Sequence, residues 1–385
     1  MKRLPFFKLS SFYFFYFASV GAFIPYWGVY LKDQGFGPAQ VGHMMAVIQG
    51  TKIIAPIVWG WLADRSGQRA GIIKLGAMLS LFLFSGVTFV AGYWWIIAVM
   101  ALFSFFWNAV LPQFEATTLR SLGEETHRYS HVRLWGSVGF IVSVTALAPL
   151  FERFGMFILP WLVMALLFAL WINSLTIKEG PVKSEEKVSR ESIIHLLRHP
   201  AVLFLLLSTF FIQASHGPYY TFYTIYLEEY GYSRSAAGQL WAVGVLAEVG
   251  IFLVLHRWLP RFGEWRLLLA ALFLTTLRWI IIATLVTHPF HLIIAQILHA
   301  ASFGISHVAA IHLIFRYFPG LLQGRGQALY TSLSFGLGGA LGSFVSGYIW
   351  VGLGGPWVFG LAAMLAAAGL FAAGLGMHFS KDHHG

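Results

Sequence analysis

The sequence contains no cysteine and few charged residues. Without cysteine, neither a disulfide framework nor a cysteine-ligated metal site can form. Charged residues occupy only 10% of the 385 positions, whereas soluble domains carry about 25%. The sequence also lacks a phosphate-binding loop and a dinucleotide fingerprint, so it supports neither ATP-driven transport nor a nucleotide cofactor. We therefore expect no cofactor and no soluble globular domain.

Apolar residues dominate the chain instead. They form 58% of it, and the mean hydropathy is +0.72. Twelve segments are long enough to cross a bilayer, at 10–31, 40–63, 70–91, 93–118, 131–151, 156–177, 201–227, 235–256, 267–287, 289–315, 326–350 and 355–378. The longest polar stretch, 178–200, separates six spans from six. We therefore predict an all-α membrane protein with two six-helix halves, 1–177 and 201–385, joined by that linker.

The distribution of basic residues predicts the orientation of these spans. If the N-terminus is cytoplasmic, the inner segments hold 20 of the 25 lysine and arginine residues. Positive charge favours the cytoplasmic side, and an even number of spans places both termini on one side. We therefore expect a multi-pass protein of the cell (inner) membrane, with both termini and the linker cytoplasmic. The net charge of +10 then reflects topology, not nucleic-acid binding, and we expect a monomer surrounded by lipid.

Two short loops at equivalent positions of the halves resemble each other, GWLADRSGQR (60–69) and RWLPRFGEWR (257–266). The first resembles the loop signature between the second and third helices of the major facilitator superfamily, with matches at Gly60, Leu62, Asp64, Arg65, Gly67 and Arg69. The resemblance implies twelve spans around one central cavity with alternating access. It also implies that Asp64, Arg65 and Arg69 hold a gate. The alternative is that these charges only follow the positive-inside rule.

Five ionisable residues fall within the spans or at their inner ends: Lys52, Glu115, Arg133, Glu248 and Arg278. Each costs roughly 3 kcal/mol on insertion scales, so we expect them to face an interior cavity and to have partners. Glu115 and Arg133 could instead reach the interface from the helix ends. Three cations face two carboxylates, and the surplus positive charge favours an anionic ligand over a neutral sugar.

A closer resemblance concerns the first half. Glu115 and Arg133, followed by LWGSVGF (134–140), resemble the sugar-binding glutamate and arginine of lactose permease and its relatives. The resemblance implies that Glu115 and Arg133 bind substrate. Lys52, in the second span, is a further candidate for the substrate site.

In the second half, Arg278 and His299 resemble the proton-coupling arginine and histidine of the same permeases, and Glu248 resembles their eighth-span glutamate. The sequence departs at Ser302, where the permeases carry the glutamate that binds the proton, so the proton site has moved or been lost, and Glu248 is the expected substitute. Burial and a neighbouring arginine act on the pKa of a carboxyl group in opposite directions. Our hypothesis is a proton switch made of Glu248, Arg278 and His299; the alternative is a static ion pair between spans eight and nine.

The segments VRLWGSVGF (132–140), GYSRSAAGQLWAVGVLAEVGIF (231–252) and the region 277–303 resemble the phenylpropionate permease branch of the superfamily. This resemblance covers nearly the whole chain. It implies that the substrate is a small aromatic carboxylate, brought in with a proton.

Aromatic residues of span seven give independent support for an aromatic substrate. At 3.6 residues per turn, His216, Tyr219, Tyr220 and Tyr223 share one helical face. Such a face could stack on a substrate ring. Ordinary packing between helices is the alternative and is slightly favoured.

The sequence therefore predicts a secondary active transporter that takes up a small organic anion with a proton, such as 3-phenylpropionate. A proton-coupled sugar or nucleoside symporter is the first alternative, and efflux of amphipathic compounds the second. An enzyme is not expected, because no nucleophile-base pair is present. A metal site is not expected either, because the histidines of span ten, His299, His307 and His312, have unsuitable spacing. A receptor that binds ligand without transport stays open.

Overall fold

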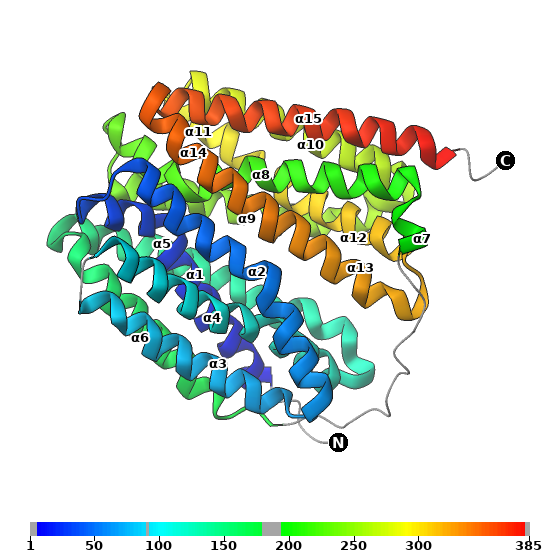
Figure 1. The fold of residues 1–385 in the computed structure, drawn as a ribbon, viewed down its shortest axis with the longest axis horizontal. Coiled ribbons are helices and arrows are strands. Elements are labelled where there is room, and N and C mark those ends of the chain that lie inside the picture. The colour runs from blue at the N-terminus through cyan, green and yellow to red at the C-terminus, as the bar shows by residue number, and fades with distance from the viewer. Residues whose placement is uncertain (1–5, 90–91, 179–193, 382–385) are drawn as a thin grey trace. The chain divides into compact units, whose positions relative to one another are not determined.

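The computed structural model describes residues 6–89, 92–178 and 194–381. Within these residues twelve helical segments are long and apolar enough to cross a membrane. The expected all-α fold with twelve spans is confirmed, and the span ends differ from the expected ones by a few residues (Figure 1). Most of the expected linker 178–200 lies outside the described residues.

Contacts between residues divide the chain into two compact units. The first unit comprises Met1–Lys183 with Gly231–Ala242, and the second comprises Ser184–Tyr230 with Val243–Gly385. The units differ from the two halves expected from the sequence by one segment, because the beginning of the eighth span belongs to the first unit.

The first unit contains six spans. Within it α1 packs along α5 and α6, and α4 packs against α2 and α3. A short 3₁₀ turn, Ser85–Thr88, extends α3. The helices are α1 (Phe6–Asp33), α2 (Pro38–Ser66), α3 (Arg69–Phe84), α4 (Tyr93–Leu122), α5 (Tyr129–Phe154) and α6 (Leu159–Ser174).

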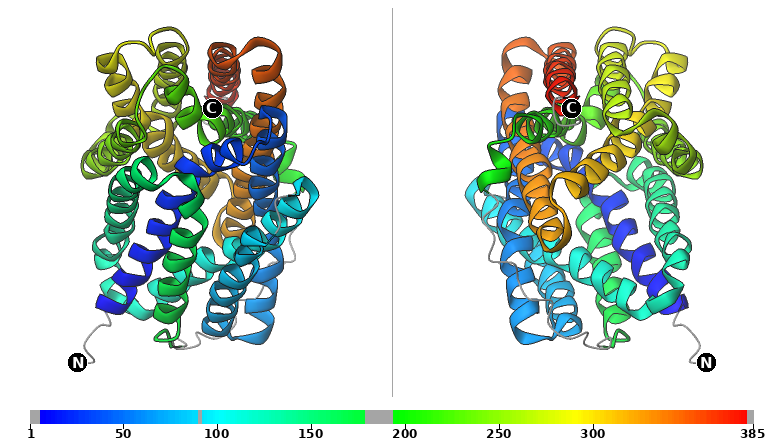
Figure 2. Two further views of the ribbon diagram at one scale, coloured as in Figure 1. Left: turned by 90° about the vertical axis from the view of Figure 1, so that its left-hand side faces the viewer. Right: turned by 90° about the vertical axis from the view of Figure 1, so that its right-hand side faces the viewer.

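The remaining spans belong to the second unit, apart from the beginning of α9. In this unit α15 packs along α8, α10 and α14, and Figure 2 shows α15 (red) beside α14 (orange) from two sides. The helices are α7 (Ile194–Leu197), α8 (Pro200–Glu229), α9 (Arg234–Phe262), α10 (Glu264–Thr284), α11 (Pro289–Ile297), α12 (Ser306–Tyr317), α13 (Gln323–Tyr330), α14 (Gly339–Leu353) and α15 (Gly355–Lys381).

Two spans of the second unit are not regular α-helices along their whole length. A π-helical segment, Ala300–Ile305, joins α11 to α12 in span ten. Another, Thr331–Gly338, joins α13 to α14 in span eleven. Such segments rotate the helix that follows and are frequent at functional sites.

Glycines bring particular helices into close contact within each unit. A Cβ at Gly139 on α5 would clash with the backbone of Phe14 on α1. In the second unit a Cβ at Gly342 on α14 would clash with the backbone of Ala214 on α8. Only glycine permits such backbone contact between helices, so these positions fix the rotation of α5 and α14 about their axes.

Candidate functional site

Glu115 on α4 and Arg133 on α5 lie together in the first unit. The Arg133 Nε is 3.8 Å from Glu115 Oε1, and the two side chains are 33% and 36% exposed. The guanidinium carbon of Arg133 lies 4.0 Å from the centre of the Phe17 ring and 5.5 Å from that of Tyr13. A Cβ at Gly136, one turn further along α5, would lie 2.7 Å from Arg133 Nη1. The glycine therefore leaves room for the arginine to lie over Phe17 and face Glu115.

Lys52 lies on the same unit but has no acidic partner. Among the described residues it forms no ion pair with a carboxylate. At 100° per residue, Lys52 stands on the buried face of α2, with Ile48, Gln49 and Trp59 on the same side. Its own side chain is nevertheless partly exposed. A partly exposed cation at the centre of an otherwise buried face is available to a ligand.

The neighbour of Lys52 ties α2 to α4. The hydroxyl of Thr51 donates a hydrogen bond to Ser104 Oγ at 2.9 Å, and Asn108 Nδ2 donates one to Thr51 Oγ1 at 2.9 Å. These bonds fix the rotation of α2, and they therefore fix the direction in which Lys52 projects.

The expected gate residues meet at the end of α2 and the beginning of α3. Arg69 forms an ion pair with Asp64, and its Nη1 donates a hydrogen bond to Gln113 Oε1 on α4 at 2.7 Å. Gly67 adopts φ 66°, which closes the C-terminus of α2 through a bond from its N–H to the carbonyl of Ala63. Arg65 points elsewhere, because its guanidinium carbon lies 5.4 Å from the Trp61 ring centre. Asp64 and Arg69 therefore join the end of α2, the beginning of α3 and the interior of α4, whereas Arg65 does not take part.

Arg278 on α10 is fully buried in the second unit. Its guanidinium donates hydrogen bonds to the carbonyl of Ala295 at 3.0 Å, to Ser302 Oγ at 2.9 Å and to Gln296 Oε1 at 3.4 Å. Its central carbon lies 4.4 Å from the ring centre of Tyr219 and 4.2 Å from that of Trp279. Within the described part of the chain no carboxylate pairs with it. Neutral acceptors and aromatic faces thus stabilise this cation.

Glu248 on α9 lies beside His299, which stands between α11 and the π-helical segment of span ten. Its Oε2 is 3.7 Å from His299 Nε2, and the two side chains are 18% and 8% exposed. Glycines allow α9 and span ten to lie this close, because a Cβ at Gly244 would lie 3.1 Å from Gln296 Oε1 and a Cβ at Gly304 would lie 2.8 Å from Ile251 Cγ2. The structure therefore brings Glu248 and His299 together, and Arg278 reaches the same span through its hydrogen bonds.

The expected aromatic face of α8 is present but buried. His216, Tyr219 and Tyr223 are at most 1% exposed. Ring centres lie 4.8 Å apart for Tyr219 and Tyr223, and 5.9 Å apart for His216 and Tyr220. Tyr219 also donates a hydrogen bond to Gln296 Oε1 at 3.0 Å. In the described state this face packs around Arg278 within the second unit.

The sequence interpretation missed Gln296 as a member of this cluster. Gln296 accepts hydrogen bonds from both Tyr219 and Arg278 and is fully buried. A signal was available, since Gln296, His299 and Ser302 recur every three residues along an apolar span. Polar residues at that spacing lie near one another on a helix.

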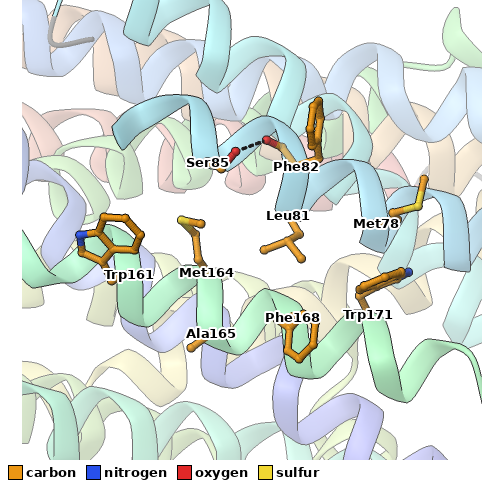
Figure 3. Close-up of a pocket in the computed structure, with 9 residues that line it drawn as sticks. All are labelled: Met78, Leu81, Phe82, Ser85, Trp161, Met164, Ala165, Phe168 and Trp171. Carbon is orange, nitrogen blue, oxygen red and sulfur yellow. Dashed lines mark hydrogen bonds between the residues drawn. The ribbon is translucent and has the colours of Figure 1, made fainter. Parts of the chain in front are cut away.

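One groove of the first unit does not fit the expected substrate. It has a volume of about 570 Å³ and lies between α3 and α6. Figure 3 shows its lining of apolar side chains, and the hydroxyl of Ser85 is occupied by a 2.6 Å hydrogen bond to the carbonyl of Phe82. Because no charged group lines this groove, it offers no cation that would pair with a carboxylate.

Comparison with known proteins identifies the family. The family model described as the MFS_1 like family matches residues 6–361. A "Probable 3-phenylpropionic acid transporter" of Escherichia coli (strain K12) is 30% identical over 371 residues, covering 92% of this chain and 94% of that protein. A maltose permease of Geobacillus stearothermophilus is 25% identical over 341 residues, covering 88% and 86%.

Solved structures share the fold at low sequence identity. A crystal structure of a variant of the nucleoside transporter NupG has a TM-score of 0.84 at 16% identity and covers 97% of this chain and 99% of that one. The POT family transporter PepTSo has a TM-score of 0.77 at 11% identity, with 98% of each chain covered. From the family match over most of the chain, the close relative and the twelve spans, we conclude that this protein belongs to the MFS_1 like family and is a multi-pass secondary transporter, not an enzyme.

Proposed function

We propose that this transporter takes up a small aromatic carboxylate together with a proton, with 3-phenylpropionate as the first substrate to test. The observation that carries this proposal is the distribution of charge. Glu115 neutralises Arg133, whereas Lys52 has no carboxylate partner in the described part of the chain. An anionic ligand would complete the pairing of a partly desolvated cation, and a neutral ligand would not. The relative from Escherichia coli, a "Probable 3-phenylpropionic acid transporter", supports the same substrate class.

Aromatic side chains near the Glu115–Arg133 pair would hold the ring of such a substrate. Tyr13 and Phe17 lie against Arg133. Tyr16, on the same helix, stacks on Trp107 with 5.6 Å between ring centres. Aromatic rings prefer offset-stacked or edge-to-face partners, and each such contact contributes about 1 kcal/mol beyond area burial. In this proposal Lys52 binds the carboxylate and the first unit supplies the aromatic wall.

Proton coupling would depend on Glu248, Arg278 and His299 in the second unit. Glu248 is the carboxyl group of this set, and it lies 3.7 Å from His299. Arg278 supplies a permanent positive charge, which the Glu248 carboxylate can approach when span ten rearranges. A buried carboxyl group in contact with a histidine can exchange a proton between two conformations of the protein.

A proton-coupled sugar or nucleoside symporter is the second candidate. It is favoured by the Glu115–Arg133 pair itself, since both side chains are about a third exposed and could bind hydroxyl groups of a neutral ligand. The maltose permease among the relatives agrees with that function.

Uptake by the purified protein in liposomes separates the two candidates. Radiolabelled 3-phenylpropionate, its amide and maltose would be supplied in turn with an imposed pH gradient, acidic outside. We expect concentrative uptake of the carboxylate and little uptake of the amide or the sugar. Uptake of maltose, with none of the carboxylate, would favour the sugar symporter.

The orientation of the protein is part of the same proposal. In this proposal the protein lies in the inner membrane with both termini in the cytoplasm. Because the chain contains no cysteine, single cysteines report their side directly. A cysteine at Gln34, in the loop after α1, should react with an impermeant thiol reagent in intact cells. A cysteine at Ser184 in the linker should not react. Labelling of Ser184→Cys without labelling of Gln34→Cys would show the opposite orientation.

A further inference from the structure

His216 on α8 has one nitrogen that is bonded and one that is not. Its Nδ1 lies 2.7 Å from the carbonyl oxygen of Ile212, and the side chain is fully buried. A carbonyl oxygen can only accept, so Nδ1 carries the hydrogen and Nε2 of the neutral ring carries a lone pair. Among the described residues this Nε2 has no hydrogen-bond partner. A buried acceptor without a donor is costly, which suggests a partner in another step of the transport cycle.

His299 has the complementary arrangement. Its Nε2 faces Glu248 Oε2 at 3.7 Å, and its Nδ1 has no hydrogen-bond partner in the described part of the chain. The ring centres of His216 and His299 are 6.3 Å apart, at an angle of 61° between ring planes. A rotation of one ring, or one bridging water, would join the two unused nitrogens. An imidazole with one nitrogen on each side can receive a proton on one and release a proton from the other.

The charged and titratable groups around His216 and His299 come from α8, α9 and α10 of the second unit. Arg278 on α10 donates hydrogen bonds to Gln296 and Ser302, which flank His299 along span ten. Tyr219 and Tyr220 lie on the same helix as His216, and Glu248 lies on α9. Glu248 contacts His299, and His299 in turn lies next to His216, so the three titratable groups form a chain within the second unit.

We propose that His216 accepts the proton beyond His299, so that Glu248, His299 and His216 form a path for protons through the second unit. In one transfer the Glu248 carboxyl gives its proton to His299 Nε2, and the Nδ1 proton of His299 passes to the lone pair of His216 Nε2; rotation of the His299 ring then restores its starting tautomer. Glu248 ends as a carboxylate and His216 as an imidazolium, with no change in oxidation state. The inference rests on the proposed proton coupling, and it gives His216 a role different from the substrate-stacking face expected from the sequence.

Two substitutions separate this role from packing. His216→Asn keeps a donor near the position of Nδ1 and removes the group at Nε2, whereas His216→Gln keeps a polar group near Nε2; neither side chain takes up a proton. Each variant would be purified into liposomes with radiolabelled 3-phenylpropionate. We expect exchange without a pH gradient to stay within about twofold of the wild type. Accumulation on a gradient of one pH unit should lose the roughly tenfold excess that one proton can support.

A matched control is His312→Asn on α12, because His312 is an exposed histidine of span ten. It should leave both exchange and accumulation unchanged. Accumulation by His216→Asn and His216→Gln at the wild-type level would overturn the proposal. Loss of exchange together with accumulation, in variants that stay monodisperse, would also overturn it and would assign His216 to packing.

If both variants fail to fold, histidine ¹⁵N spectra of the otherwise intact protein decide the matter. We expect a buried imidazole with Nδ1–H whose Nε2 exchanges protons with the solvent faster in the wild type than in Glu248→Gln. The absence of such a ring would overturn the inference. Failure of the proposed function looks different, because the wild type itself would then not concentrate 3-phenylpropionate on a pH gradient.

Discussion

In the first unit the guanidinium of Arg133 lies 3.8 Å from a carboxylate and is a third exposed, whereas in the second unit that of Arg278 is fully buried among neutral acceptors and aromatic rings. Lys52 adds a partly exposed cation to the first unit. The two units therefore present positive charge differently. In the first unit a ligand can reach the positive charge. In the second unit the positive charge is buried, in the same region as a glutamate and two histidines. The difference suggests substrate binding in the first unit and proton handling in the second.

The irregular helices follow the same division. Among the described spans, π-helical segments occur in spans ten and eleven, both in the second unit. The segment Ala300–Ile305 directly follows His299 and contains Ser302, which accepts a hydrogen bond from Arg278. A change from π-helix to α-helix would rotate these residues relative to α10. The buried cluster thus borders a π-helical segment of the second unit.

The same substitution in each unit gives the strongest test of this comparison. Arg278→Lys keeps the charge but loses the planar group that stacks on Tyr219 and Trp279 and bonds to three acceptors. We expect the free energy of unfolding to fall by roughly 3 kcal/mol or more, from lost cation–π contacts and buried hydrogen bonds. Arg133→Lys should cost about 1 kcal/mol or less, because that ion pair is partly exposed. Thermal unfolding in detergent measures both, and equal losses would contradict the comparison.

The two glutamates provide the next test. Glu248→Gln cannot release a proton, so we expect exchange of substrate to persist while accumulation on a gradient of one pH unit falls by about tenfold, to the level without coupling. Glu115→Gln should keep coupling and mainly raise KM. Exchange and gradient-driven uptake of 3-phenylpropionate, measured side by side, check this. If Glu115→Gln uncouples transport and Glu248→Gln does not, the roles of the two units are reversed.

Lys52→Met tests the accessible cation of the first unit. A hydrogen bond to a charged group contributes about 1.5–3 kcal/mol, so the KM for 3-phenylpropionate should rise by roughly tenfold to a hundredfold. Weak uptake of the amide should change little, because it carries no negative charge. Lys32→Met is the control, since Lys32 is an exposed lysine at the end of α1. An equal loss for carboxylate and amide would remove Lys52 from the anion site.

The smallest effect is expected at the loop between α2 and α3. Asp64→Asn removes the ion pair with Arg69 but leaves the Arg69–Gln113 hydrogen bond. Since the Asp64 side chain is 70% exposed, the pair contributes little in free energy, and we expect transport to slow by about twofold to fivefold. Substrate affinity should stay the same, because Asp64 would stabilise one conformation without contacting the ligand. A large change in affinity with normal turnover would place Asp64 in the binding site.

The sequence predicted features that depend on local composition. Each span could be recognised because a membrane helix must satisfy its own backbone and present apolar side chains along some twenty residues. The same pattern also showed which charged residues lie within a span and require partners there, such as Lys52 and Arg278. The loop 60–69 was evident as well, because its charges lie within one turn between helices.

The partners of those charges were decided by tertiary structure. Whether Glu248 meets His299 or Arg278, and whether Gln296 accepts from Arg278, depends on how α9, α10 and α11 rotate against one another. That rotation is set by glycine contacts, such as those at Gly244 and Gly304, and by the π-helical turn after His299. These contacts join residues tens of positions apart, so no local pattern contains them. The sequence by itself therefore determined which residues require partners, and the packing of helices determined which partners they have.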